Sequence, residues 1–250
     1  MIICEIGLNH CGSKEYADDY LDVLMEKEVD AVTFQIREPG FYLNKEKRKL
    51  HLPNDYYREA KNKVEASNKK FGIALSDLTL LDFFESINTD FYKILSKDAN
   101  NEDFVSTLMA KTKKDVYIST GLSNDQQIEK LSKYSTGLER KISLIHTQLS
   151  NRISDVNLLS VKKLKDKYNM PISYGHHCEN VHVLYLALVF KPSDLFFYVK
   201  GERETVHPDE DHAIKLENIS KVISNIKNLP LSIGDGIKVN VSNTIKGQEI

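Results

Sequence analysis

The stretch IICEIGLNHCGSKEYADDYLDVLMEK (2–27) decides the fold. It begins with an apolar run, IICEIG, that has the length and composition of a buried strand. A short loop follows, with Gly7 at its start and Gly12 near its end. Ser13 then stands where a helix is capped, ahead of apolar residues at helical spacing over 16–27. A strand, a short loop and a helix in this order form the repeating unit of α/β proteins.

The same unit recurs outward from this stretch along the chain. Seven further apolar runs are AVTFQI (31–36), GIAL (72–75), FYKIL (91–95), VYIST (116–120), ISLIHT (142–147), PISYG (171–175) and LFFYV (195–199). Helix-like stretches between or after them are 56–71, 78–87, 101–111, 124–134, 155–168, 181–190 and 217–229. Strands separated by helices pair in parallel through right-handed crossovers. Eight such units in 250 residues predict a single-domain (β/α)8 TIM barrel. An open doubly wound sheet is the alternative, because periodicity does not decide whether the sheet closes.

Composition excludes several classes of protein. Apolar residues make up 41% of the chain, enough for a core, and no run has the length of a membrane helix. The N-terminus lacks the basic region of a signal peptide, so we expect a cytoplasmic protein with no membrane partner. Three cysteines without a CxxC pair are expected to be reduced. A net charge of −2 with both signs interspersed excludes a nucleic-acid partner.

Polar residues gather where the predicted strands end, which is where a barrel of this kind carries its active site. They are Glu5, Asn9, Gln35, Arg37, Asp77, Lys93, Ser96, Asp98, Ser119, Thr120, His146, Gln148, His176, His177 and Lys200. Glu5 within an apolar strand is costly to bury unless it is paired, which favours a functional role. Neighbours on a strand alternate sides, so we expect His177 to face the mouth and His176 to be a structural partner.

The same residues carry a family likeness. The segments CEIGLNHCGS (4–13), YKILSKD (92–98), STGLSN (119–124), LIHT (144–147), YGHH (174–177), DEDHAIKLE (209–217) and IGDGIKV (233–239) occur in the order found in sialic acid (N-acetylneuraminate) synthases. The chain resembles the barrel domain of that family. The resemblance implies a C–C bond-forming transferase of carbohydrate biosynthesis. Such an enzyme condenses phosphoenolpyruvate with an N-acetylated amino-sugar aldehyde to give a nonulosonic acid and phosphate.

The resemblance also implies roles for single residues. Glu5 and Gln35 match positions near the sugar and the reacting carbons. Lys93, Ser96 and Ser119 match phosphoenolpyruvate contacts, and hydroxyls such as Thr120 at a helix start suit an anion. Asn9 and Gln148 are further candidates for substrate binding. The candidate catalytic acids are Glu5, Asp98 and Asp211. His177 matches one of two histidines that hold a divalent metal, usually manganese.

Several positions depart from the family's pattern. Thr33 replaces a lysine, Gly175 and His176 replace a serine and an aspartate, and Lys200 replaces the second metal histidine. A protonated lysine has no lone pair for a metal. Lys200 is then a catalytic candidate whose charge stands in for the metal. Alternatively, Lys200 or Lys93 forms a Schiff base in a metal-independent aldolase or lyase. A third alternative recruits His176, His207 or His212 as ligands, and a fourth is a non-catalytic homologue that binds a sugar acid.

The predicted barrel covers residues 1–240, and 241–250 form a tail. In the family a small antifreeze-like domain begins there, and we expect it to be absent from this chain. The partners that follow from the resemblance are the small-molecule substrates and either a homodimer or a separate chain that supplies this domain.

Overall fold

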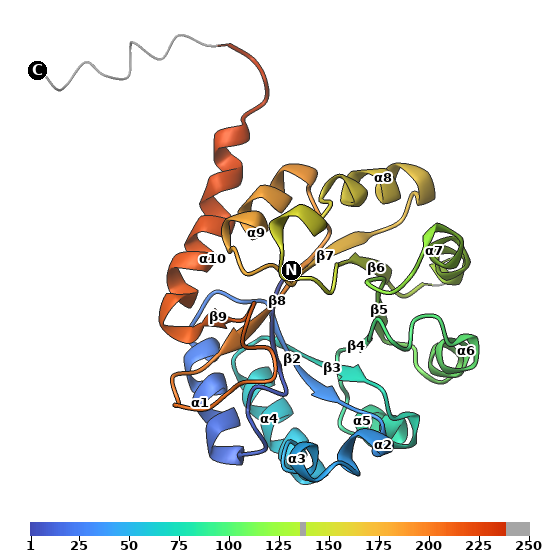
Figure 1. Cartoon of the computed structure of the whole chain (residues 1–250), viewed down its shortest axis with the longest axis vertical. Helices are drawn as coiled ribbons and strands as arrows, with labels where there is room; N and C mark the ends of the chain where they lie inside the picture. Colours follow the sequence, from blue (N-terminus) through green and yellow to red (C-terminus); the bar gives the residue numbers. More distant parts are fainter. Residues whose placement is uncertain (136–138, 239–250) are drawn as a thin grey trace, which may run out of the picture.

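The computed structural model describes residues 1–135 and 139–238. Its main sheet is a closed barrel of eight parallel strands, in which β1 pairs with both β2 and β8 (Figure 1). The strands are β1 (Ile2–Gly7), β2 (Ala31–Ile36), β3 (Lys70–Leu75), β4 (Phe91–Ile94), β5 (Asp115–Ser119), β6 (Ile142–His146), β7 (Ile172–His176) and β8 (Leu195–Lys200). A short strand, β9 (Ile214–Lys215), pairs with the end of β8. The predicted TIM barrel is confirmed, and the open sheet is wrong because β1 and β8 pair.

Helices surround the barrel at the predicted places. They are α1 (Lys14–Met25), α4 (Asn54–Ala66), α5 (Leu81–Ser86), α6 (Glu102–Lys111), α7 (Asp125–Ser132), α8 (Leu159–Tyr168), α9 (His182–Ala187) and α10 (Ile219–Asn228). Ser13 caps α1 as expected, because its Oγ accepts a hydrogen bond from the backbone N–H of Tyr16 at 3.1 Å. Two short helices after β2, α2 (Pro39–Tyr42) and α3 (Lys45–Arg48), were not predicted.

The barrel interior is filled at its centre by aromatic side chains. Phe91, Tyr117 and Phe196 are fully buried and pack edge to face, with ring centroids 5.3 and 5.0 Å apart. Gly72 is needed beside them, since a Cβ there would lie 2.3 Å from the ring of Phe91. The interior is therefore a packed core rather than a channel.

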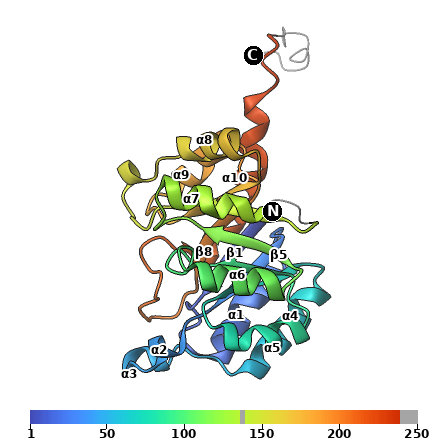
Figure 2. The same cartoon turned by 90° about the vertical axis from the view of Figure 1, so that its right-hand side faces the viewer.

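Long connections extend from one end of the barrel, the end at which the strands terminate. Helices α2 and α3 and the segment that follows β8 (201–213) lie on the left in Figure 2. They surround the predicted mouth. Within the described ranges no helix is both long and apolar enough to cross a membrane. The predicted tail, 241–250, lies outside the described residues.

Candidate active site

A cavity of about 200 Å³ opens at the ends of the strands, and we call it the mouth cavity. Polar side chains from six strands or the loops after them line it. They are Gln35, Arg37, Lys93, Ser96, Lys97, Ser119, Thr147, His177, Tyr198 and Asp209. Aliphatic parts of Leu95, Leu122, Ile145 and Leu149 complete its wall. A concave hollow with a few convergent polar groups is the usual form of a ligand site.

A buried ion pair lies at the base of the mouth cavity. Glu5 is 2% exposed and Lys93 is 4% exposed, and the ammonium group of Lys93 donates to the carboxylate of Glu5. The Lys93 Nζ atom also lies 5.6 Å from the centroid of the Tyr198 ring. Each charge satisfies the other, which is the condition under which two ionised groups are tolerated inside a protein. Lys93 therefore presents a buried cation to the cavity.

Two more cations and several hydroxyls share this cavity. Arg37 and Lys97 both pair with Glu38, at 3.1 and 3.0 Å. Burial alone would raise the pKa of Glu38, but the hydrogen bonds from these two cations lower it to about 2. Ser96 Oγ accepts a hydrogen bond from the backbone N–H of Gly121 at 3.2 Å. Cations and hydroxyl donors around one hollow suit an anionic ligand.

Asp98 lies beside this group without lining the cavity. Its carboxylate accepts hydrogen bonds from Ser76 Oγ at 2.5 Å and from Lys97 Nζ at 2.7 Å. It therefore holds Lys97 at the rim of the cavity. On the opposite wall, Gln35 Oε1 accepts a hydrogen bond from the Tyr198 hydroxyl at 3.2 Å.

His177 forms another part of the wall, and His212 packs against it from outside the cavity. The rings of His177 and His212 stack with centroids 4.4 Å apart, and Tyr198 packs edge-on against both. Burial lowers the pKa of His177 well below its ordinary value and that of His212 to about 4, so both rings are neutral at pH 7. His176 points elsewhere: it lines a neighbouring cavity and contacts the Tyr174 hydroxyl at 3.3 Å.

The structure places Asp209 in the mouth cavity, where the sequence analysis expected Asp211. Burial raises the pKa of Asp209 to about 7, and the negative charge of Glu5 adds to the effect. Its backbone N–H donates to Asn9 Oδ1 at 3.0 Å. Asp211 lies at the surface instead and accepts a hydrogen bond from Asn151 Nδ2 at 2.9 Å. Both acids belong to the run HPDEDH (207–212), and no signal in that run distinguishes them.

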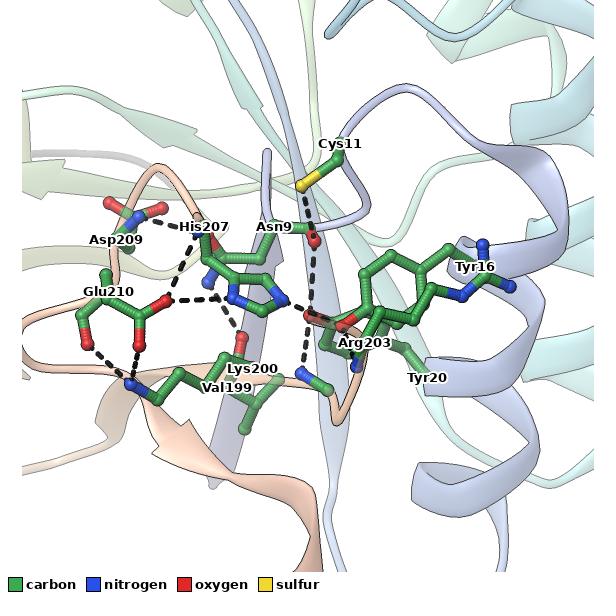
Figure 3. Close-up of polar contacts among 11 residues, drawn as sticks. Asn9, Cys11, Tyr16, Tyr20, Val199, Lys200, Arg203, His207, Asp209 and Glu210 are labelled. Carbon is green, nitrogen blue, oxygen red and sulfur yellow. Dashed lines mark hydrogen bonds and ion pairs between the residues drawn. The ribbon is translucent and has the colours of Figure 1, made fainter. Parts of the chain in front are cut away.

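Lys200 does not line the mouth cavity; it anchors the segment after β8 (Figure 3). Its ammonium group pairs with the carboxylate of Glu210 and donates to the Glu210 carbonyl at 2.9 Å. His207 contacts the same carboxylate through Nδ1 at 2.9 Å and the Tyr16 hydroxyl through Nε2 at 2.7 Å (Figure 3). Asn9 Nδ2 completes this anchor by donating to the carbonyl of Val199 at 2.8 Å.

The predicted site residues thus fall into two groups. Gln35, Lys93, Ser96, Ser119 and His177 line the mouth cavity, and Glu5 contacts it through Lys93. The second group is not among the lining residues: Asn9, Asp98, Thr120, Gln148, His176, Lys200, His207, Asp211 and His212. Thr120 Oγ1 donates to the carbonyl of Ile145 at 2.9 Å, and Gln148 is half-buried beyond β6. The sequence analysis missed Thr147 and Asp209 as site residues, although the fold places each in a loop at the mouth.

The residues do not fit a resident divalent metal. Among residues 1–135 and 139–238, no three His, Cys, Asp or Glu side chains converge as ligands. The nearest arrangement is His177 stacked on His212, whose Nε2 lies 4.0 Å from Asp209 Oδ1. Lys200 is held by Glu210 and supplies no lone pair. We therefore assign no reaction step to a metal.

Comparison with known proteins gives one consistent result. The model of the NeuB family matches residues 20–238. The N,N'-diacetyllegionaminic acid synthase of Campylobacter jejuni is 23% identical over 95% of this chain and 78% of its own length. A pseudaminic acid synthase from the same species is 24% identical over 94% of this chain and 75% of its own length. The crystal structure of sialic acid synthetase from Leptospira borgpetersenii, solved with citrate, superposes with a TM-score of 0.87 at 22% identity. It covers 98% of this chain and 89% of that one, and this likeness shows the fold.

Proposed function

The chain belongs to the NeuB family, and from this premise we propose that it condenses phosphoenolpyruvate with an N-acetylated amino-sugar aldehyde. The products are a nonulosonic acid and inorganic phosphate. One observation carries the proposal: Lys93, Ser96 and Ser119 line a single cavity beside the buried carboxylate of Glu5. The names of the relatives, which are synthases of legionaminic and pseudaminic acids, support the class of product.

The cavity suits phosphoenolpyruvate because that substrate carries a phosphate and a carboxylate. Lys93, Lys97 and Arg37 supply positive charge, and Ser96 and Ser119 supply hydroxyl donors. Lys93 faces the substrate from the most enclosed position. Electrostatic stabilisation is strongest where water is excluded, so this ammonium is placed to act on charge that develops during the reaction.

The reaction forms one carbon–carbon bond. C3 of phosphoenolpyruvate bonds to the aldehyde carbon, the aldehyde oxygen takes a proton, water adds at C2 and phosphate leaves. Asp209 lines the cavity and Glu5 contacts it through Lys93, so we assign proton transfer to these two carboxylates. The Lys93 ammonium stabilises the negative charge that grows on the aldehyde oxygen as the bond forms.

Manganese is the cofactor that the family resemblance implies, yet no three His, Cys, Asp or Glu side chains converge among the described residues. The chain's own cations therefore carry the charge in this proposal. The rate is expected to be the same within about twofold with added manganese and with a chelator. On the resemblance alone, we also propose a homodimer located in the cytoplasm. Light scattering after size-exclusion chromatography checks the homodimer.

The proposal is tested by mixing the protein with phosphoenolpyruvate and a panel of N-acetylated amino-sugar aldehydes. Release of phosphate and the mass of the sugar-acid product are measured together. The matched control is the double variant Glu5→Gln/Lys93→Met, which removes both charges of the buried pair. Folded wild-type protein that releases no phosphate with any sugar, with or without manganese, would contradict the proposal.

One observation favours a second function, a Schiff-base aldolase or lyase: Lys93 Nζ is a buried amine that lines the cavity. Such enzymes form an imine between a lysine and a carbonyl substrate. Borohydride reduction in the presence of pyruvate, followed by peptide mass analysis, separates the two functions. A modified Lys93 supports the aldolase or lyase. An unmodified Lys93 counts against it and favours the condensation. Lys200 is not a candidate for the imine-forming lysine, since it pairs with Glu210 outside the cavity.

A further inference from the structure

Thr147 has a buried hydroxyl without a partner. It follows the last residue of β6 and is 3% exposed. Its Oγ1 makes no hydrogen bond within the described part of the chain, yet the side chain lines the mouth cavity. A buried hydroxyl left unpaired costs free energy, so native structures usually pair it with protein, water or a ligand. The side chain that carries this unpaired atom therefore lies where a ligand in the cavity would contact it.

Two glycines pack closely beside this side chain. A Cβ on Gly175 would lie 3.4 Å from Thr147 Oγ1 and 3.2 Å from its Cβ. A Cβ on Gly121 would lie 2.9 Å from Ser96 Oγ and 3.0 Å from Thr147 Cγ2, so there is no room for one. Ser96 and Thr147 are therefore held against the same short stretch of backbone. The two hydroxyl-bearing side chains form a cradle at the ends of β4, β5 and β6.

Two other threonines have unpaired buried hydroxyls but lie outside the mouth cavity. Thr33 and Thr89 also have buried Oγ1 atoms without partners among the described residues. Neither lines the mouth cavity, so neither can meet a ligand there. Thr147 differs from both because Lys93, Lys97 and Arg37 line the same hollow. The cradle therefore combines neutral donors with nearby positive charge.

We propose that the Thr147 hydroxyl donates a hydrogen bond to the phosphoryl group of phosphoenolpyruvate, opposite Ser96. This inference rests on the proposed function and assigns one end of the substrate to one part of the cavity. A phosphoryl group offers three peripheral oxygens, which accept several donors at once. The carboxylate end of phosphoenolpyruvate then lies away from Thr147.

The test uses Thr147→Val, which keeps the shape of the side chain and removes the hydroxyl. Thr147→Ser keeps the hydroxyl, and Thr89→Val removes an unpaired buried hydroxyl elsewhere. In Thr147→Val the KM for phosphoenolpyruvate is expected to rise about tenfold, the effect of losing a charge-assisted hydrogen bond. The KM for the sugar changes less than about twofold by the same reasoning. Thr147→Ser retains the donor and is expected to keep the KM for phosphoenolpyruvate nearer to wild type than Thr147→Val does, and Thr89→Val matches wild type.

Binding of inorganic phosphate and of pyruvate to each variant is measured by calorimetry, without turnover. Thr147→Val is expected to weaken phosphate binding by the same factor and to leave pyruvate binding unchanged. Equal phosphate affinity in wild type and Thr147→Val overturns the inference, as does a loss confined to pyruvate or a wild type that binds no phosphate. Because this measurement needs no sugar, a wild type that binds phosphate but catalyses nothing contradicts the proposed function alone.

Discussion

Lys93 and Lys200 lie at the ends of β4 and β8, and each pairs with a glutamate, but the two regions differ in what surrounds the pair. Lys93 and its partner Glu5 are both almost fully buried, and the lysine lines the mouth cavity. Lys200 pairs with Glu210, whose side chain is 43% exposed, and it anchors the segment after β8. The same pair of residue types therefore forms a charged wall of the site in one region and a loop anchor in the other.

The comparison shows that position at a strand end is insufficient to define a catalytic lysine. The direction of each lysine follows from its place on the strand and from the partner that it meets. Lys93 lies two residues after Phe91, whose ring packs inside the barrel, so it points inward and pairs with Glu5 of β1. Glu210 lies in the loop that Lys200 itself precedes, and it draws that lysine toward the loop (Figure 3).

The largest expected difference between the two lysines is in stability. Lys93→Met leaves the Glu5 charge buried and unpaired, which costs about 3–5 kcal/mol. Lys200→Met leaves Glu210 in contact with water and costs about 1 kcal/mol or less. Unfolding in urea measures both. Glu5→Gln/Lys93→Met is expected to recover most of the loss, and a double variant as unstable as Lys93→Met would contradict the pairing.

The loop anchored by Lys200 offers a second comparison, between Asp209 and Asp211. Asp209 lines the mouth cavity, so Asp209→Asn is expected to lower kcat by about 100-fold, the lower range for loss of a proton-transferring group. Asp211 lies at the surface beside Asn151, so Asp211→Asn is expected to keep kcat within about threefold on the same scale. Steady-state rates of phosphate release decide between them. A larger loss in Asp211→Asn would reverse the placement of the two acids.

A third charged cluster, at the opposite end of the barrel, tests whether burial alone makes an ion pair costly to break. Asp194 begins the turn into β8 and accepts hydrogen bonds from the N-terminal ammonium at 2.9 Å, from Lys141 and from Ser173 at 3.0 Å. Burial would raise the pKa of Asp194, but hydrogen bonds from Lys141 and the N-terminus outweigh it and hold the pKa below its ordinary value. This carboxylate therefore stabilises the fold above its unfolded pKa, which is about 4.

Asp194→Asn is expected to cost about 2 kcal/mol at pH 7, as for hydrogen bonds to a charged group. The difference from wild type shrinks as the pH falls below about 4, because Asp194 of the unfolded chain takes up a proton there while the folded carboxylate stays ionised to lower pH. Thermal unfolding at pH 7, 5 and 3 measures this difference in stability between wild type and Asp194→Asn. Asp166→Asn, in the exposed pair with Lys162, serves as the control and costs about 0.5 kcal/mol or less. A stability difference for Asp194→Asn that stays constant down to pH 3 would show that the ionised Asp194 carboxylate does not stabilise the fold.

Most of the fold could be predicted from the sequence because apolar runs and helical periods are local signals. The predicted strand 195–199 is observed as β8, Leu195–Lys200. The first strand is observed at the predicted residues. Helices α2 and α3 were missed because PGFYLNKEKRK (39–49) has no apolar period. Strand β3 begins two residues before the predicted run, since the exposed Lys70 carries no apolar signal.

The site was less predictable because it depends on contacts between distant parts of the chain. The ion pair of Lys93 joins it to Glu5, which is 88 residues away. The placement of Asp209 follows from its hydrogen bond to Asn9, 200 residues away, and from the anchor at Lys200. The surroundings of Thr147 depend on its close packing against Gly121 and Gly175 on neighbouring segments. None of these relations leaves a periodic signal in the sequence.

Phosphoenolpyruvate is expected to bind in the mouth cavity against Lys93. A calorimetric titration of phosphoenolpyruvate into wild type, Lys200→Met and Glu5→Gln/Lys93→Met, each confirmed to be folded, tests this placement. Wild type and Lys200→Met are expected to bind with equal affinity, and the double variant about 100-fold more weakly, because it lacks the buried cation. A double variant that binds as tightly as wild type, or a loss of binding in Lys200→Met alone, would contradict the account.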